Sequence, residues 1–231
     1  MHKEEILCLA VLPEDLTEGR RYAQFSIHYT FDRMAFGVDD TTALCRRLAK
    51  IIQGKTCEVA LVRFLRRHGI AHTTREGQTP HTDPDRFDLR ILNQIVDLKT
   101  FAVPAAVAKP ARLLNCLGLV PDHHPRDQWS RRGHYARFVF GFFEGRLMVR
   151  LAPRAEQLLT QRAPLNDDHL QVEATPLKFY VTAAPTIADC EAKFRKVRAG
   201  TRCPQYSRGT RIDNMGCRVG ELSSFREFIS M

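Results

Sequence analysis

Two charged side chains, Asp97 and Lys99, interrupt a hydrophobic segment whose residues otherwise favour a β-strand. Residues two apart in a strand point to the same face, so the carboxylate and the ammonium are expected to lie together. A carboxylate provides the hard oxygen ligands that Mg²⁺ binds, and an ammonium adds a nearby point charge. The spacing therefore indicates a magnesium site on one face of the strand.

A second short strand precedes this one, and we expect the two to form a hairpin. Placing the turn near residues 93–94 pairs Arg90 with Asp97 and Asp88 with Lys99. Cross-strand partners share a face of the sheet. The expected result is a patch on which the carboxylates of Asp88 and Asp97 converge beside the cationic groups of Arg90 and Lys99.

This arrangement resembles the PD-(D/E)XK nuclease superfamily. The signature of that family is an acidic residue at the start of one strand, followed by (D/E)-X-K on the next. Here the second part is Asp97-Leu98-Lys99, and the first part corresponds to Asp88. The resemblance covers about residues 40–150.

Two further features belong to this resemblance. Asp83 and Asp85 lie just before the first strand, and either could take the place of Asp88. The family often adds an acidic residue on the helix before the hairpin, and Glu58 matches that position. On a helical wheel Glu58 lies at the edge of an apolar stripe. The alternative is that Glu58 is a first-turn glutamate favoured by the helix dipole.

The resemblance implies an α/β (α+β) fold with a restriction-endonuclease-like core. That core is a central mixed β-sheet flanked by helices, here with extra N- and C-terminal strands and helices. One or two Mg²⁺ ions, which Mn²⁺ can replace, would be held by Asp88, Asp97, Glu58 and the backbone carbonyl of Leu98. Lys99 would orient or deprotonate the attacking water. The implied catalytic residues are Asp88, Asp97, Lys99 and Glu58.

The implied activity is that of a Mg²⁺-dependent DNA endonuclease, most like a type II restriction endonuclease. A Holliday-junction resolvase and a repair or transposition-associated nuclease are alternatives within the same chemistry. A non-catalytic DNA-binding protein with a nuclease-like core is a further alternative. Symmetric cutting of both strands would favour a homodimer. The structural alternative for the site itself is an exposed Asp–Lys pair on an edge strand.

The charge balance of the chain favours a polyanionic partner. Thirty-five lysines and arginines against 26 acidic residues give a net charge of +9, and phosphates release counterions when such side chains bind. The stretch 193–211 holds seven of the basic residues and no acidic one. A solvated basic face is the alternative to DNA contact. The expected DNA-binding residues are Arg195, Lys196, Arg198, Arg202, Arg208, Arg211, Arg131 and Arg132.

The chain is expected to form a single nuclease domain over residues 1–231. Its core is expected at about 40–160, with N-terminal strands in 1–38 and a basic C-terminal extension in 161–231. The N-terminus lacks the layout of a signal peptide, and no apolar run approaches a membrane span. We therefore expect a cytoplasmic protein with no membrane contact.

Apolar periodicity predicts the remaining elements. Strands over 5–12 and 22–31 are expected to form a small N-terminal sheet. Two helices, over 41–54 and 55–68, are expected to be separated at Gly54. Further helices are expected over 111–119, 155–161 and 186–197. Strands are expected over 135–143 and 146–151, continuing the central sheet, and two more within 169–182, split at Pro176.

Overall fold

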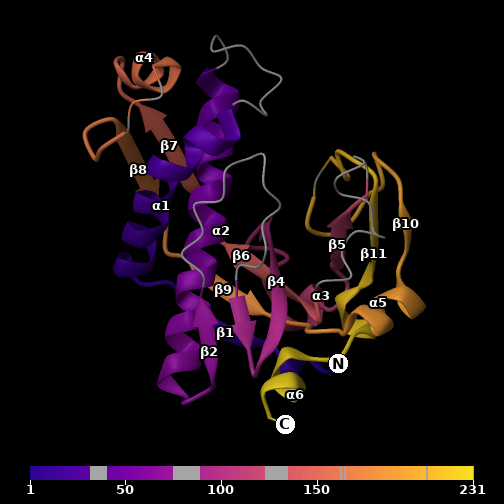
Figure 1. Cartoon of the computed structure of the whole chain (residues 1–231). Helices are drawn as coiled ribbons and strands as arrows, with labels where there is room; N and C mark the ends of the chain where they lie inside the picture. The colour runs from indigo at the N-terminus through magenta and orange to yellow at the C-terminus, as the bar shows by residue number, and fades with distance from the viewer. Residues whose placement is uncertain are drawn as a thin grey trace.

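A computed structural model describes residues 1–31, 41–74, 89–122, 135–161, 163, 165–206 and 208–230 (Figure 1). Its helices are α1 (Pro13–Phe31), α2 (Thr41–Arg67), α3 (Pro110–Leu113), α4 (Ala155–Thr160), α5 (Ile187–Lys193) and α6 (Phe225–Ile229). Its strands are β1 (Leu7–Ala10), β2 (His72–Thr74), β3 (Leu89–Ile91), β4 (Gln94–Val103), β5 (Leu117–Pro121), β6 (Arg137–Glu144), β7 (Leu147–Leu151), β8 (Leu170–Ala174), β9 (Lys178–Val181), β10 (Arg195–Val197) and β11 (Asn214–Arg218). Short 3₁₀ turns cover Lys3–Glu5 and Val219–Glu221.

The central sheet has the strand order β1-β9-β6-β4-β3-β2 within the described residues. Strands β4 and β6 run parallel, whereas the other neighbours are antiparallel. The expected α+β class with a mixed central sheet and flanking helices is therefore confirmed. Because β1 and β9 belong to this sheet, it extends beyond residues 40–160.

The two faces of the central sheet bury different partners. One face packs against α2, where fully buried side chains of the helix meet alternate residues of the strands: Cys57, Leu61 and Leu65 against Val96, Val139 and Phe179. The opposite face packs against α3, β5 and α5 through Phe138, Phe140 and Phe142. Since side chains alternate along a strand, Asp97 and Lys99 of β4 lie on this second face.

Helix α2 is continuous, so the expected break at Gly54 is wrong. A glycine inside a helix costs about 1 kcal/mol relative to alanine, and burial of apolar residues on both sides of Gly54 offsets that cost. Helix α1 packs closely along α2 at Gly19, where an added Cβ would lie 2.2 Å from the hydroxyl of Thr56. A larger residue at position 19 would push the two helices apart.

The segment 22–31 belongs to helix α1, so the expected strand and the small N-terminal sheet are wrong. Ala23 and Ile27 are four residues apart and fully buried, which is the spacing of one helical face. The Asp15 carboxylate accepts a hydrogen bond from the Leu12 N–H at 2.8 Å and so caps the start of the helix. The alternating pattern was compatible with both structures, and contact with α2 favours the helix.

A separate sheet with the order β10-β11-β5 forms a second body beside the central sheet, here called the basic lobe together with residues 198–213 (Figure 1). The expected helix over 186–197 is only partly correct. Helix α5 begins at the Thr186 cap and ends at Lys193, and residue 194 is already extended at φ −68° and ψ 143°. Residues 195–197 then pair with β11.

Of the remaining expected elements, some are confirmed and others are not. The two strands expected in 169–182 are confirmed as β8 and β9. Strand β7 pairs with β8 in a two-stranded sheet and does not continue the central sheet. The helix expected over 111–119 is short, since β5 already begins at Leu117. None of the described helices combines the length and apolar character needed to cross a bilayer.

Candidate active site at the β3–β4 hairpin

The hairpin turns at Leu92 and Asn93, whose φ values are +48° and +62°. Two successive left-handed residues make the tight turn that matches the twist of a hairpin. Arg90 consequently pairs with Ile95, not with Asp97, and the expected register is wrong by two residues.

A two-residue slip preserves the face on which each side chain lies. Arg90 therefore still shares a face with Asp97 and Lys99. Asp88 itself, like Asp83 and Asp85, lies outside the described residues.

Asp97 and Lys99 come together as the sequence predicts. The Lys99 Nζ lies 2.7 Å from the Asp97 Oδ2. The Asp97 side chain is 3% exposed, whereas that of Lys99 is 25% exposed. An exposed pair on an edge strand is excluded here, since Asp97 is buried and β4 lies between β3 and β6.

Burial makes the Asp97–Lys99 ion pair costly in solvation energy. A carboxylate taken out of water loses solvation, and an ion pair regains that energy only when its geometry is good. Breaking a buried pair by removing one partner is strongly destabilising, whereas an apolar pair of similar size is often no less stable. Stability alone therefore gives little reason for Asp97 to be acidic.

Glu58 lies in the middle of α2, so the first-turn explanation for its acidity is wrong. Its Oε1 lies 2.6 Å from the Lys55 Nζ, and both side chains are mostly buried. Burial raises the pKa of the Glu58 carboxyl, and the charge and hydrogen bond of Lys55 oppose that rise. Lys55 also lies over the ring of Tyr22, 5.0 Å from its centroid.

The position of Glu58 around α2 shows which part of the sheet it approaches. Arg63 bonds Asp15 and the Ala10 carbonyl, so that flank of the helix faces the β1 end of the sheet. Glu58 lies five residues earlier, about 140° around the helix. It therefore faces the flank toward β4, β3 and β2, but on the α2 face of the sheet, whereas Asp97 lies on the opposite face. The expectation that Glu58 shares a site with Asp97 is not supported by this placement.

A complete metal site is not assembled by the described residues. Within them, no group of three or more His, Cys, Asp or Glu side chains is close enough to hold a metal ion. Glu58 is paired with Lys55, and Asp97 with Lys99. The carboxylates that precede Leu89 in the sequence, Asp83, Asp85 and Asp88, lie outside the part that the structure describes.

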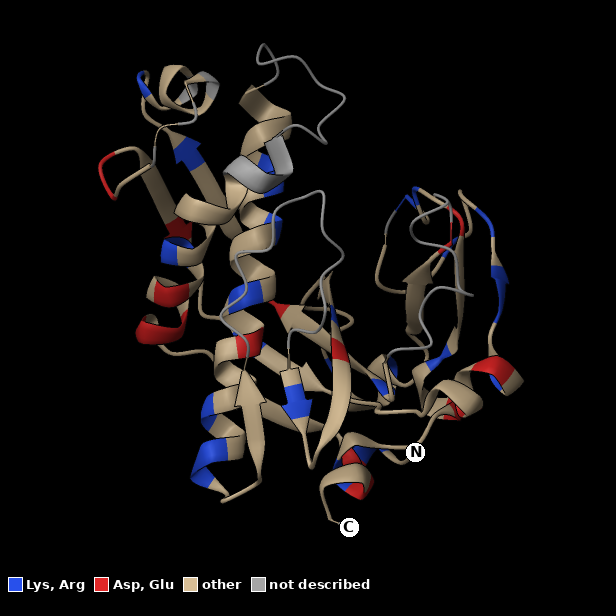
Figure 2. Cartoon of the chain, viewed as in Figure 1, with Lys and Arg blue, Asp and Glu red and all other residues tan. Residues whose placement is uncertain are grey.

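A pocket of about 540 Å³ opens beside Lys99, between α2, β4 and the basic lobe. We call it the interlobe pocket. Cationic side chains reach it from three elements: Lys50 from α2, Lys99 from β4 and Arg211 from the basic lobe. Figure 2 shows Lys and Arg residues along α2 and on the basic lobe that faces it.

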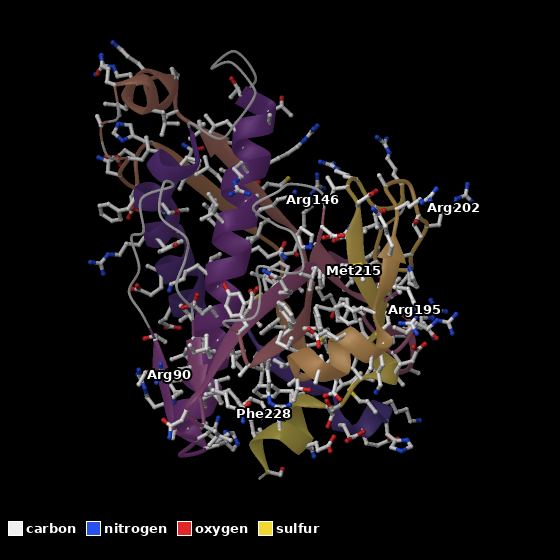
Figure 3. The ribbon with its side chains drawn as sticks, turned by 45° about the vertical axis from the view of Figure 1, so that its right-hand side comes forward. Arg90, Arg146, Arg195, Arg202, Met215 and Phe228 are labelled. Carbon is white, nitrogen blue, oxygen red and sulfur yellow. The ribbon has the colours of Figure 1, made fainter. Side chains whose placement is uncertain are left out.

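The other predicted DNA-binding residues are spread over the basic lobe. Figure 3 shows Arg195 and Arg202 at its outer edge, pointing away from α2. Lys196 is exposed and lies 3.3 Å from Asp213, an acid just beyond the stretch that looked purely basic. Arg131 and Arg132 lie outside the described residues. Arg198 and Arg208 are exposed.

Lys50 is the pocket residue that sequence reasoning missed. It lies seven residues before Cys57, which is buried against the sheet, so both occupy nearly the same face of α2. A lysine on the apolar side of a helix was the available signal. It was obscured because α2 was divided at Gly54, which separated the two residues into different helices.

In comparisons with known proteins, no family model, no curated protein and no solved structure matches this chain.

Proposed function

We propose that this protein is a metal-dependent DNA endonuclease of the PD-(D/E)XK type, with a restriction-endonuclease-like core. One observation carries the proposal: a buried carboxylate, Asp97, is paired with Lys99 at 2.7 Å on a central strand. The same lysine lines a pocket that Lys50 and Arg211 also reach. A carboxylate–lysine pair beside a cationic pocket suits chemistry on a phosphodiester.

The donors present fit Mg²⁺ in kind. Asp97 offers carboxylate oxygens, which Mg²⁺ prefers to nitrogen or sulfur. In the proposed site Asp97, Asp88 and the Leu98 carbonyl would hold one or two Mg²⁺ ions, which Mn²⁺ could replace. Glu58 is left out of this set, because α2 covers the face of the sheet opposite to Asp97. The bound ion supplies positive charge at the phosphate and lowers the pKa of a water molecule.

Lys99 has two tasks in the proposed mechanism. Its ammonium carries three N–H donors, and one bond to Asp97 leaves others available to a water or to a phosphate oxygen. The Lys99 ammonium orients the attacking water and stabilises the charge that develops on the phosphate. Asp97 holds the lysine in position, because the carboxylate is buried and cannot turn to solvent.

The partner proposed is DNA, and the net charge of +9 supports a polyanion. We propose one nuclease domain, a cytoplasmic location and a homodimer that cuts both strands. A type II restriction endonuclease is the form we favour. Its alternatives, a resolvase, a repair or transposition nuclease and a DNA-binding protein without activity, are outcomes of the following test.

Plasmid DNA is incubated with the protein and Mg²⁺, Mn²⁺ or a chelator, and the products are separated and their ends sequenced. Discrete metal-dependent fragments support a restriction endonuclease. Cutting confined to branched DNA indicates a resolvase. Binding without cleavage in either metal overturns the nuclease proposal. A Lys109→Ala variant, at an exposed lysine near α3, is the control for loss of one positive charge.

A further inference from the structure

The interlobe pocket has two unlike sides. Lys50, Lys99 and Arg211 bring positive charge to it, whereas Phe101 and Ile212 are among the residues that give it an apolar wall. Its volume of about 540 Å³ falls in the range of ~300–1,000 Å³ found for pockets that enclose small molecules. The pocket therefore has room for more than a single phosphate group.

Of the three cations at this pocket, Lys99 is paired with Asp97, whereas Lys50 and Arg211 repel each other. Partial burial lowers the pKa of Lys50, and the positive charges of Arg211 and Arg47 lower it further. Among the described residues, neither Lys50 nor Arg211 forms an ion pair with a carboxylate. Like charges that face each other are costly, and an anion bound between them would relieve the repulsion.

Arg211 is presented by a loop with fixed geometry. The Thr210 hydroxyl donates to the Arg198 carbonyl at 2.8 Å, and the Gly200 N–H donates to the Thr210 carbonyl at 2.7 Å. Gly209 has φ +80°, and an added Cβ there would lie 2.6 Å from the Gly200 carbonyl oxygen. The loop therefore needs glycine at this crossing and holds Arg211 beside the pocket before any ligand binds.

The apolar side of the pocket offers a surface to a planar group. Phe101 is only partly buried, and its ring lies against Phe142 with centroids 5.7 Å apart. Ile212 extends the wall from the basic lobe. A nucleobase stacks on such surfaces with little dependence on its identity.

We infer that the interlobe pocket binds one nucleotide, with its phosphate between Lys50 and Arg211 and its base against Phe101 and Ile212. The inference rests on the proposed function only for the origin of that nucleotide. In a nuclease it belongs to the substrate strand, next to the phosphate at Lys99. A strand nucleotide must leave its base stack to enter the pocket, which costs least where the strand is unpaired.

The test measures binding to the intact protein by calorimetry without divalent metal. The ligands are dAMP, inorganic phosphate, deoxyadenosine and a five-nucleotide single strand. We expect dAMP to bind more tightly than phosphate or deoxyadenosine, and the single strand to bind more tightly than dAMP. Equal affinity for phosphate and dAMP would overturn the base contact, and equal affinity for dAMP and deoxyadenosine would overturn the phosphate contact. If the single strand binds no more tightly than dAMP, the proposal that the bound nucleotide belongs to a DNA strand is overturned.

Variants locate the binding site. Lys50→Gln and Arg211→Gln should each weaken dAMP binding about tenfold, since each removes a charge-assisted hydrogen bond. Ile212→Ser should weaken dAMP binding but leave phosphate binding unchanged. Arg66→Gln is the matched control, because Arg66 is exposed and lies about 24 Å further along α2 than Lys50. Unchanged dAMP affinity in both cation variants would overturn the site.

A thermal melt of the free protein separates binding loss from misfolding. Lys50→Gln removes a like-charge contact, so its melting temperature should equal or exceed that of the parent. Plasmid cleavage by the parent is scored separately. If the parent binds dAMP in this pocket but never cuts DNA, the nucleotide site stands and the nuclease proposal fails. If the parent cuts DNA and no ligand binds here, only this inference fails.

Discussion

Two Lys–Asp pairs in this molecule have the same chemistry and different surroundings. On β4 the Asp97 side chain is 3% exposed, and Lys99 holds it at 2.7 Å. On the basic lobe Asp213 is 34% exposed, and Lys196 lies 3.3 Å away with 55% of its side chain exposed. The two pairs therefore differ in burial and not in the groups that form them.

The exposed pair has a sufficient local explanation. Hydrogen bonds from the Ala199 N–H and from Lys196 lower the pKa of the Asp213 carboxyl, so the acid fixes the start of the loop after β10. Exposed pairs of this kind contribute little to stability. The buried pair on β4 differs in that its lysine extends to a pocket.

The largest expected effect on the cleavage rate comes from changing Asp97. Asp97→Asn keeps the shape of the side chain and removes its charge, so we expect cleavage to fall at least ~10²-fold while DNA binding survives. The exposed partner of the comparison, Asp213→Asn, is the matched control and should cut at the parent rate. Initial rates of plasmid nicking measure both. Equal cleavage rates for the two variants would contradict the proposal that only the buried pair takes part in cleavage.

Lys99→Ala should likewise abolish cleavage, because the attacking water loses the group that orients it. Its expected rate loss is again at least ~10²-fold. The change also leaves Asp97 buried without its lysine, so circular dichroism must first show a folded protein. Lys196→Ala removes the corresponding lysine of the exposed pair and should retain cleavage. A folded Lys99→Ala protein that cuts normally would contradict the assignment.

The third prediction concerns the carboxylate that accompanies Asp97. Asp88 directly precedes β3, whose described register pairs Leu89 with Val96, and Asp83 and Asp85 lie further from β3 in the sequence. Asp88→Ala should therefore abolish Mg²⁺-dependent cleavage, and alanine at 83 or 85 should not. Parallel assays of the three variants decide the matter. An inactive Asp85→Ala beside an active Asp88→Ala would contradict the choice of Asp88.

A smaller effect is expected from the exposed side of the comparison. Replacing Arg195, Lys196 and Arg198 with alanine should weaken DNA binding and reduce its salt dependence, by roughly one unit of log–log slope for each phosphate that the variant no longer neutralises. Because Lys196 is paired with Asp213, we expect its contribution to be the smallest of the three. Filter binding at several salt concentrations measures the slope. An unchanged affinity and slope would mean that this face is only solvated.

The sequence predicted the two charged neighbours on β4 because a strand with period two places them together regardless of the rest of the fold. Their common face with Arg90 also survived a register that was wrong by two residues. The turn at Leu92-Asn93 could not be located, since its left-handed φ values are demanded by strand twist and only one of its residues is a common turn former.

Other features depend on contacts that a linear pattern does not contain. The segment 22–31 is helical because Ala23 and Ile27 pack against α2. Strand β1 joins β9, nearly 170 residues away in the chain. The interlobe pocket exists only where α2, β4 and the basic lobe meet, so Lys50 and Arg211 could not be recognised as neighbours beforehand.

The smallest expected effect concerns Glu58, a third carboxylate paired with a lysine. Burial raises the pKa of this carboxyl above 4.5, so the folded protein binds its proton more tightly than the unfolded chain does. The stability that this proton provides is present below pH 4.5 and is lost as the pH rises through the folded pKa. Ionised Glu58 is therefore a cost to the folded protein at neutral pH.

Glu58→Gln removes that cost and keeps a hydrogen-bond partner for Lys55. The free energy of unfolding of the variant, relative to the parent, should therefore be more favourable at pH 7 than at pH 4.5. Urea unfolding at the two pH values measures this difference, and Glu18→Gln at an exposed position of α1 controls for the loss of one carboxylate. A relative stability that falls between pH 4.5 and pH 7 would mean that Lys55 compensates the burial of Glu58 fully. Glu58 would then join the Lys196–Asp213 pair and the buried Asp15–Arg63 pair as a local structural contact. The Asp97–Lys99 pair would still differ from all three in the pocket beside its lysine.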